Sequence, residues 1–211
     1  MPKPTFFNLK EEKREKIEIV AIKEFAERGF HGARLNNIVQ EAVIAKGSFY
    51  QYFCDLEDLY THLIIKLNRR KMDAIYEELK RHKTTDIFTQ LALILKAVLQ
   101  FIHSCGEDVL KMLNHPFPAF FYASEEIREL REKSEKTLFE PLIKEAIAKG
   151  DIIDDEDLAY SVLSHSGAII REYLFHKAHS RDYFDIFSDE KAYNDAAELI
   201  NNFIKQGLKA K

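Results

Sequence analysis

The feature that most constrains the fold of this chain is an apolar repeat of helical period, which recurs in long stretches with few breaks. Between residues 55 and 82 the repeat runs through Leu56, Leu59, Tyr60, Leu63, Leu67, Met72, Ile75, Tyr76 and Leu79, with one slip near Asn68. Residues three and four positions apart share one face of an α-helix, so this stretch predicts a helix about 40 Å long. No convincing alternation of apolar and polar residues indicates a strand.

Shorter stretches of the same repeat predict further helices on both sides of the long one. Asn8 is expected to cap the first helix, with Glu11 three residues on as in a capping box, and Gly29 is expected to end it. Two short helices should follow, one around residues 35–42 and one over residues 46–53. Beyond the long helix, others are expected from Thr84 or Thr85 to Ile102, from Ser124 to Lys149 with Gly150 as the stop, and over residues 156–179 and 188–209.

Few residues interrupt these patterns, because the 211 residues include only 7 glycines and 5 prolines. Pro141 lies inside the expected helix that ends at Lys149, and it should kink or divide that helix. The sequence therefore predicts an all-α fold of about nine helices. We expect a three-helix head over residues 1–54 and a larger helical body over residues 55–211.

Composition and charge narrow the class of protein. With 46% hydrophobic and 31% charged residues, the chain is typical of a soluble globular protein. The net charge is −4, yet residues 1–53 hold 9 basic and 7 acidic residues, so the head is mildly basic and the rest acidic. Cys54 and Cys105 have no metal or redox spacing, and no signal peptide or membrane span is evident. We expect a cytoplasmic protein without a membrane partner or a cofactor.

The segment from Lys46 to Phe53 is too short to be a stable helix alone, yet it presents two tyrosines and a glutamine among phenylalanines. Phe49, Tyr52 and Phe53 fall on one side and can anchor the segment to the two preceding helices. Three short helices, of which the second and third are joined by the tight turn Val43-Ile44-Ala45, form a helix-turn-helix unit. Such a unit places a helix in the major groove of DNA.

The opposite side of this segment has the chemistry that a DNA contact requires. Small residues at a helix start let backbone N–H groups approach a phosphate, and hydroxyls and cations add bonds to phosphate oxygens. Glutamine can pair with adenine through two hydrogen bonds, which makes Gln51 the best candidate for reading a base. We predict that the DNA-binding residues are Arg34, Lys46, Gly47, Ser48, Tyr50, Gln51 and Tyr52.

Residues 25–60, FAERGFHGARLNNIVQEAVIAKGSFYQYFCDLEDLY, resemble the TetR family of transcriptional regulators. The chain has the family's Phe-x-x-x-Gly-Phe run at the end of helix one, its Lys-Gly-small-aromatic-Tyr-x-x-Phe recognition run and its acidic-Leu start of helix four. The specific resemblance covers about residues 10–70. Beyond them the chain is similar to the family in length and helical character.

Four residues depart from the family pattern. Val43 stands where the family usually has a turn glycine, so the turn has to form without a residue that is free in φ. Ala45 replaces the usual serine cap, and Arg34 replaces the usual threonine. Leu56 replaces a lysine that often contacts phosphate, so we predict no such contact there.

The resemblance also implies a role for the body. Proteins of this family are homodimers whose last two helices pack together, and their middle helices enclose a ligand. Here an apolar face on residues 158–174 and a second around Leu199, Ile200, Phe203 and Ile204 fit such a dimer. The predicted ligand-binding residues are His103, Phe117, Phe120, Phe121, Tyr122 and His165, each with ordinary core packing as the alternative.

The sequence thus predicts a regulator, not an enzyme: a repressor that binds a palindromic DNA operator as a homodimer and is released by a small hydrophobic or aromatic effector. One alternative is a helical interaction module that kept the head and lost DNA binding. Leu56 and the nearly neutral charge of the head favour this alternative. Another is a helical metal protein, suggested by His176 and His179 on one helical face and by His62. No metal-site motif accompanies these histidines.

Overall fold

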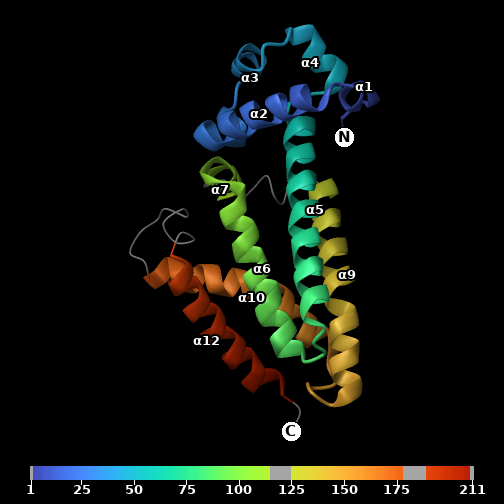
Figure 1. The fold of residues 1–211 in the computed structure, drawn as a ribbon, viewed down its shortest axis with the longest axis vertical. Helices are drawn as coiled ribbons and strands as arrows, with labels where there is room; N and C mark the ends of the chain where they lie inside the picture. Colours follow the sequence, from blue (N-terminus) through green and yellow to red (C-terminus); the bar gives the residue numbers. More distant parts are fainter. Residues whose placement is uncertain (1, 115–124, 178–188, 210–211) are drawn as a thin grey trace. The chain divides into compact units, whose positions relative to one another are not determined.

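A computed structural model describes residues 2–114, 125–177 and 189–209 of the chain (Figure 1). These residues form ten helices, of which nine have seven residues or more, and they contain no β-strand. The helices are α1 (Pro4–Phe7), α2 (Glu11–Gly32), α3 (Leu35–Glu41), α4 (Lys46–Tyr52), α5 (Leu56–His82), α6 (Ile87–Cys105), α7 (Glu107–Asn114), α9 (Glu125–Lys149), α10 (Glu156–Lys177) and α12 (Glu190–Leu208). The all-α prediction is confirmed.

The chain divides into two compact units. The first unit comprises Met1–Arg69 and Cys105–Leu130, and therefore holds α1 to α4, the first half of α5, α7 and the first residues of α9. The second unit comprises Arg70–Ser104 and Arg131–Lys211, with the second half of α5, α6, most of α9, α10 and α12. The three short helices expected in the head all lie in the first unit. The predicted functional division after residue 54 stays a prediction.

The first unit is built around phenylalanine side chains from α1, α2 and α4 and from Phe53, the residue after α4. Its fully buried residues include Phe6, Ile17, Phe25, Ile38, Phe49, Phe53, Leu59, Leu63 and Met112. Aromatic rings meet edge to face within this core, with Phe25 and Tyr60 at 4.9 Å between centroids and Phe30 and Tyr60 at 5.2 Å. Burying one such side chain stabilises the fold by about 1.5–3 kcal/mol. Helices as short as α3 and α4 depend on this packing.

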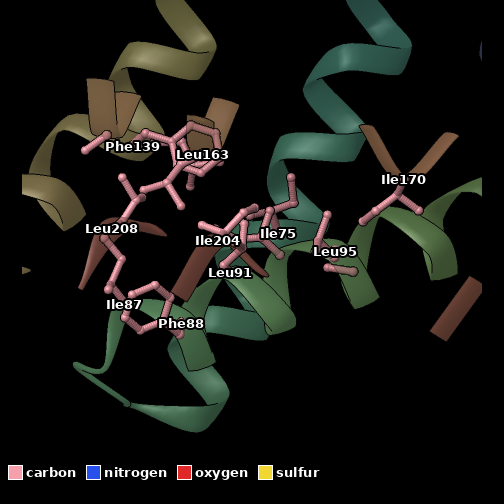
Figure 2. Packing of buried hydrophobic residues seen from close by; sticks show 14 of the residues in the cluster. Ile75, Ile87, Phe88, Leu91, Leu95, Phe139, Leu163, Ile170, Ile204 and Leu208 are labelled. Atoms are coloured by element: carbon pink, nitrogen blue, oxygen red, sulfur yellow. The ribbon is translucent and has the colours of Figure 1, made fainter. Parts of the chain in front are cut away.

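The second unit has an aliphatic core to which five helices contribute (Figure 2). Residues from α5 and α6 meet residues from α9, α10 and α12, among them Ile75, Leu91, Leu95, Phe139, Leu163, Ile170, Ile204 and Leu208. Tyr193 of α12 is buried there, and its hydroxyl donates to the backbone oxygen of Leu95 at 3.3 Å. Burial raises the pKa of Tyr193, so the phenol stays neutral and serves as a donor.

The predicted helices α3, α4, α5 and α10 are present close to their expected limits, but two expected helix starts are wrong. Asn8 caps no helix start; it is the C-cap of α1, and α2 begins at Glu11 after Lys10. Helix α6 begins after Asp86, whose carboxylate accepts from the backbone N–H of Thr89 at 2.8 Å. The expected cap Ser124 lies outside the described residues. Gly150, with φ 75°, ends α9 as expected.

Helix α9 remains a single helix across Pro141, so the expected division did not occur. Proline removes one backbone donor and crowds the carbonyl of the residue four positions earlier, here Thr137. The hydroxyl of Thr137 bonds one turn back to the oxygen of Lys133 at 2.7 Å, a contact that bends helices locally. Burial of Leu138, Phe139 and Ile143 in the second unit holds the helix on both sides of the proline.

Helix α6 is strongly apolar, and among the described residues it is the one helix long and apolar enough to be considered as a membrane span. By length and composition alone its 19 residues could cross a membrane, with a mean hydropathy of 1.5 over the best window. Half of that window is buried inside the protein, where Phe88, Leu91, Ile94 and Leu95 belong to the core of the second unit. The apolar character of α6 is therefore explained by its central place in that unit.

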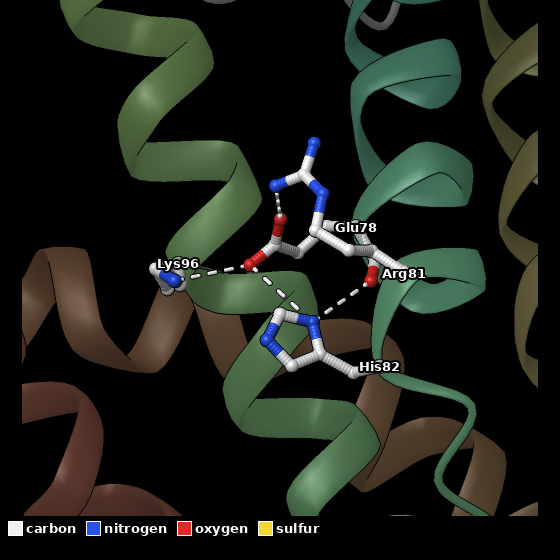
Figure 3. A network of polar contacts seen from close by, with 4 residues as sticks. All are labelled: Glu78, Arg81, His82 and Lys96. Carbon is white, nitrogen blue, oxygen red and sulfur yellow. Dashed lines mark hydrogen bonds and ion pairs between the residues drawn. The ribbon is translucent and has the colours of Figure 1, made fainter.

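A cluster of charged side chains joins α5 to α6 in the second unit (Figure 3). The carboxylate of Glu78 forms ion pairs with Lys96 Nζ of α6 at 3.0 Å and with Arg81 Nη1 at 2.7 Å. His82 Nδ1 lies 3.8 Å from the same carboxylate and donates to the backbone oxygen of Glu78 at 3.2 Å. The hydrogen bond from Lys96 is the largest influence on Glu78, and the pKa of this carboxyl lies below its ordinary value.

Candidate functional site

Helix α4 is held in the first unit by its apolar side. Phe49 and Phe53 are fully buried, and their rings lie 5.5 Å apart. Tyr52 is 7% exposed; its backbone oxygen accepts from the N–H of Lys3, and its ring lies 6.2 Å from that of Phe6. A seven-residue helix is too short to be stable in water by itself, so these contacts define its position.

The other side of α4 is open to solvent. Lys46, Gly47, Tyr50 and Gln51 are exposed, with 47% of Tyr50 accessible, and Ser48 is half-buried. A Cβ atom added at Gly47 would meet no other atom within 4 Å, so packing inside the chain does not explain this glycine. The structure thus brings five of the predicted DNA-binding residues to one exposed side. It leaves Tyr52 with little surface for such a contact.

The turn between α3 and α4 is a Schellman motif with valine in the position that glycine usually takes. The N–H of Ile44 donates to the oxygen of Val39 at 2.9 Å, and the N–H of Val43 donates to that of Gln40 at 3.2 Å. Val43 has φ 57° and is 76% exposed. The turn therefore does require a left-handed residue, which costs an L-amino acid about 1–2 kcal/mol.

The start of α3 is capped from α2. The Arg34 backbone N–H donates to Glu24 Oε1 at 2.8 Å, and Asn37 Nδ2 donates to the same carboxylate at 3.0 and 3.1 Å. Glu24 is buried and ties the start of α3 to α2, whereas a threonine at position 34 would accept from a backbone N–H inside α3. The side chain of Arg34 is not needed for capping and is exposed.

The link from α4 to α5 is fixed by two aspartates. Asp55 Oδ1 accepts from the backbone N–H of Asp58 at 2.8 Å, and Asp58 Oδ2 accepts from the N–H of Cys54 at 2.9 Å. This reciprocal arrangement resembles a capping box and sets the direction in which α5 leaves α4. Leu56, the first residue of α5, is half-buried and brings no cation to this end.

A buried ionic cluster joins α2 to α5. Glu18 Oε1 accepts a hydrogen bond from His62 Nε2 at 2.8 Å, and Glu18 Oε2 accepts one from Lys66 Nζ at 2.5 Å. Burial opposes ionisation of Glu18, but the hydrogen bonds from His62 and Lys66 outweigh it and lower its pKa. His62 is thus engaged by a carboxylate. In the part of the chain that the structure describes, no three His, Cys, Asp or Glu residues gather as a metal site would require; His179 lies outside that part.

The predicted effector residues are only partly covered by the structure. Phe117, Phe120, Phe121 and Tyr122 lie outside the described residues. His103 of α6 and His165 of α10 are exposed, and His165 Nδ1 donates to the oxygen of Ser161 in its own helix at 2.9 Å. Neither histidine lines the cleft that the second unit contains.

That cleft lies between α5 and α6 and was not predicted. It has a volume of about 290 Å³ and is lined by Arg70, Ala74, Ala97, Gln100, Phe101 and Ser104. The guanidinium of Arg70 lies 5.9 Å from the centre of the Phe101 ring. Alanines and an aromatic ring beside one cation and two polar side chains suit a ligand that is partly apolar and partly anionic. Arg70 stands at a helix position that periodicity alone does not distinguish.

A short helix with a buried aromatic side and an exposed polar side, reached through a tight turn from a second short helix, defines a helix-turn-helix protein. Residues 20–63 match the family model described as bacterial regulatory proteins, tetR family. The HTH-type transcriptional regulator YdgC of Bacillus subtilis strain 168, an uncharacterized protein, is 30% identical over 103 residues. These residues are 48% of this chain and 52% of YdgC, so the match spans about half of that relative.

Solved structures match over more of the chain. A TetR family transcriptional regulator from Chloroflexus aurantiacus J-10-FL is 27% identical over 100% of both chains, with a TM-score of 0.64. The transcriptional regulator FadR from Bacillus subtilis, solved in complex with stearoyl-CoA, shares the fold at 19% identity over 88% of this chain and 96% of its own, with a TM-score of 0.66. Residues 20–63 in the first unit therefore carry the helix-turn-helix domain of the TetR family of transcriptional regulators, and the chain is similar to a regulator of that family over its whole length.

Proposed function

We propose that the chain is a cytoplasmic repressor that binds a palindromic DNA operator as a homodimer and is released by a small amphiphilic effector. The observation that carries this proposal is α4, whose phenylalanine side is buried and whose Lys46-to-Gln51 side is exposed. In this proposal Gln51 reads a base edge, and Lys46, Ser48 and Tyr50 contact phosphates.

Selection of bound duplexes from a random pool tests DNA binding directly. We expect a palindromic consensus whose half-sites are about one helical turn apart, and an affinity that falls steeply as salt rises. Negligible binding to every duplex at low salt would instead favour an interaction module that has lost DNA binding. Half-buried Leu56 and the small excess of positive charge in the head are the features that favour this second candidate.

Two substitutions on α4 separate base reading from phosphate contact. Gln51→Ala should relax the preference at one operator position by about 1–3 kcal/mol. Lys46→Ala should weaken binding to all sequences alike and reduce the salt slope by about one. Lys80→Ala, which removes an exposed lysine of the second unit, is the matched control and should change neither quantity.

The dimer is proposed from apolar side chains left exposed on the last two helices. Leu199 and Phe203 lie one turn apart on α12, with Phe203 74% exposed, and Leu158 and Ile169 are exposed on α10. Their neighbours Leu163, Ile170 and Ile204 belong to the core of the second unit and are not free for a partner. Exposed apolar patches of this kind mark interfaces.

Phe203→Glu should convert the dimer to a monomer in sedimentation experiments. Ile19→Glu serves as the control, because Ile19 is an exposed apolar residue on α2, 65% accessible. A monomeric parent, or a dimer that is unchanged by Phe203→Glu, would contradict the proposed interface.

The effector is proposed to bind in the cleft between α5 and α6, with Arg70 holding its anionic group. The shared fold of FadR, which was solved with stearoyl-CoA, supports a fatty acyl thioester as the first probe. We expect stearoyl-CoA to bind the parent and to lower its affinity for the operator. Arg70→Met should weaken this effect, whereas Arg69→Met, the preceding exposed arginine outside the cleft, should not.

Helix α5 gives this response a physical basis. Its residues Arg70 and Ala74 line the cleft, and its residues Leu59 and Leu63 are buried in the first unit. A ligand that binds one conformation of this helix better than another shifts the population of DNA-competent dimers. Coupling of about 1–3 kcal/mol would change the DNA affinity about 5–150-fold, and a ligand with equal affinity for both states would change nothing.

A further inference from the structure

The C-terminal end of α4 is bound by the first residues of the chain. The last carbonyls of a helix have no partner within the helix. In α4 the backbone oxygen of Tyr52 accepts from the N–H of Lys3 at 2.8 Å, and that of Tyr50 accepts from Lys3 Nζ at 2.7 Å. The backbone oxygen of Gln51 accepts from the hydroxyl of Thr5. Three successive carbonyls of α4 are therefore satisfied by two residues that lie more than forty positions earlier.

This N-terminal segment, residues 3–9, is itself anchored in its middle by Phe6 and at its C-terminal end by Arg14. Phe6 is fully buried, and its ring lies 4.7 Å from that of Phe53 and 5.3 Å from that of His62. At the other end, Arg14 Nη1 of α2 donates to the backbone oxygens of Phe7 at 2.7 Å and Leu9 at 3.1 Å. The segment thus ties α4 to α2 and α5 within the first unit.

The position of these bonds matters because α4 has only two turns. The ammonium group of Lys3 lies at the negative end of the helix dipole, where a cation is favoured. The carbonyls that Lys3 and Thr5 hold belong to Tyr50 and Gln51, whose side chains point to the exposed side. A hydrogen bond between a pair of bases and a glutamine tolerates little displacement of the helix that carries the glutamine.

We propose that Lys3 and Thr5 are positioning residues, which fix the last turn of α4 so that Tyr50 and Gln51 meet the DNA in one orientation. This inference rests on the proposed DNA binding by α4. It assigns Lys3 and Thr5 no contact with a base. The competing interpretation is that exposed Lys3 binds a phosphate directly, and the two interpretations differ in their dependence on salt.

The test compares the parent with Thr5→Val, which removes the hydroxyl without changing charge, and with Thr5→Ser, which restores it. Lys3→Met removes the ammonium group, and Lys13→Met, at an exposed lysine of α2 outside the segment, is the control for loss of one charge. Two quantities are measured: hydrogen exchange of the amides of Lys3 and residues 50–53 in the free protein, and the affinity ratio between the selected operator and one with the Gln51 base pair replaced.

We expect Thr5→Val and Lys3→Met each to speed exchange at residues 50–53 about fivefold, the factor that one hydrogen bond corresponds to. Both should lower the affinity ratio, Thr5→Ser should restore parental values, and Lys13→Met should leave exchange and ratio unchanged. A merely structural role would leave the affinity ratio untouched once the variant is folded, as checked by its thermal melt.

Unchanged exchange in both Thr5→Val and Lys3→Met would overturn the inference. So would a Lys3→Met variant with parental exchange and a smaller salt slope, because Lys3 would then be a phosphate contact. If the parent binds no duplex, the proposed function fails, and the exchange measurement alone still decides whether the segment orders the end of α4.

Discussion

The two units each end a helix with the same pair of backbone hydrogen bonds, but with different residues in the left-handed position. In the second unit α9 ends at Gly150, where the N–H of Asp151 donates to the oxygen of Ala146 at 3.0 Å and that of Gly150 to Ile147 at 2.9 Å. In the first unit α3 ends at Val43 with the equivalent bonds. Glycine adopts a positive φ freely, whereas valine is strained there. The backbone geometry is thus set by the surrounding fold, and the residue determines only its energetic cost.

The units also differ in how they hold α5. In the first unit Glu18 meets one buried partner, His62, and one exposed partner, Lys66. In the second unit Glu78 meets Arg81, Lys96 and His82, all of which are exposed. A carboxylate whose partners are buried contributes more to stability than one whose partners can be solvated by water. The first unit therefore depends more strongly on its ionic cluster.

The largest expected effect comes from removing these carboxylates. Glu18→Ala should lower the free energy of unfolding by about 3 kcal/mol, because it leaves the buried His62 without its acceptor. Glu78→Ala should cost about 1 kcal/mol, as expected for partners that reach water. Urea unfolding of the two variants measures both values. Equal losses would show that the two clusters are equivalent and would remove this difference between the units.

A smaller effect is expected from Gly150→Val, which would give the end of α9 the same left-handed valine that ends α3. Gly150→Val should destabilise the protein by about 1–2 kcal/mol through backbone strain. A Cβ at Gly150 would meet no atom within 4 Å, so steric overlap adds nothing to this cost. Thermal and urea unfolding measure the change. Gly150→Asn is the matched control and should cost less, because asparagine tolerates the left-handed conformation.

The reverse change in the first unit should stabilise the protein. Val43→Gly relieves the strain at φ 57°, offset in part by the greater freedom of glycine in the unfolded chain, for a net gain of about 0.5–1 kcal/mol. Val43→Ala keeps the left-handed strain and should gain little. A loss of stability in Val43→Gly would mean that the exposed valine makes a contact that outweighs its strain.

The smallest expected effects concern pH and salt. The pKa values of Glu18 and Glu78 are both lowered in the folded protein, so their contributions are fully present above the ordinary value of 4.5 and are lost as pH falls through the lowered values. In Glu18→Gln and in Glu78→Gln, the free energy of unfolding should fall less steeply than in the parent as pH decreases below 4.5. Added salt should reduce the difference between parent and variant more for Glu78 than for Glu18, because its partners are exposed.

The sequence was sufficient for the elements that depend on local periodicity. The period of Phe49, Tyr52 and Phe53 predicted both the existence of α4 and which side of it is buried. Leu59, Leu63, Leu67 and Ile75 in the same way predicted α5. The interpretation of Gly150 as a helix stop was also correct, since the one residue that adopts a positive φ freely stood just after an apolar repeat.

Features made by residues far apart in the sequence could not be predicted. Helix α1 has four residues, too few for a periodic signal, and its bonds to α4 join residues 46 and 47 positions apart. The adjacent pair Phe6-Phe7 was the available signal, and only the fold shows that Phe6 is buried. Arg70 likewise becomes a candidate ligand residue only because α6 brings Phe101 beside it.

The anchoring of the N-terminal segment has a practical consequence for anyone who purifies this protein. A tag fused ahead of Pro2 would be separated by this one residue from Lys3, whose backbone N–H donates to the backbone oxygen of Tyr52. The carboxylates of an acidic tag would then compete with the phosphates of a duplex for the surface around Lys3, and affinities measured with such a fusion would describe the tag as well as the protein. Assays of DNA affinity therefore call for a cleaved N-terminus or a tag placed beyond α12.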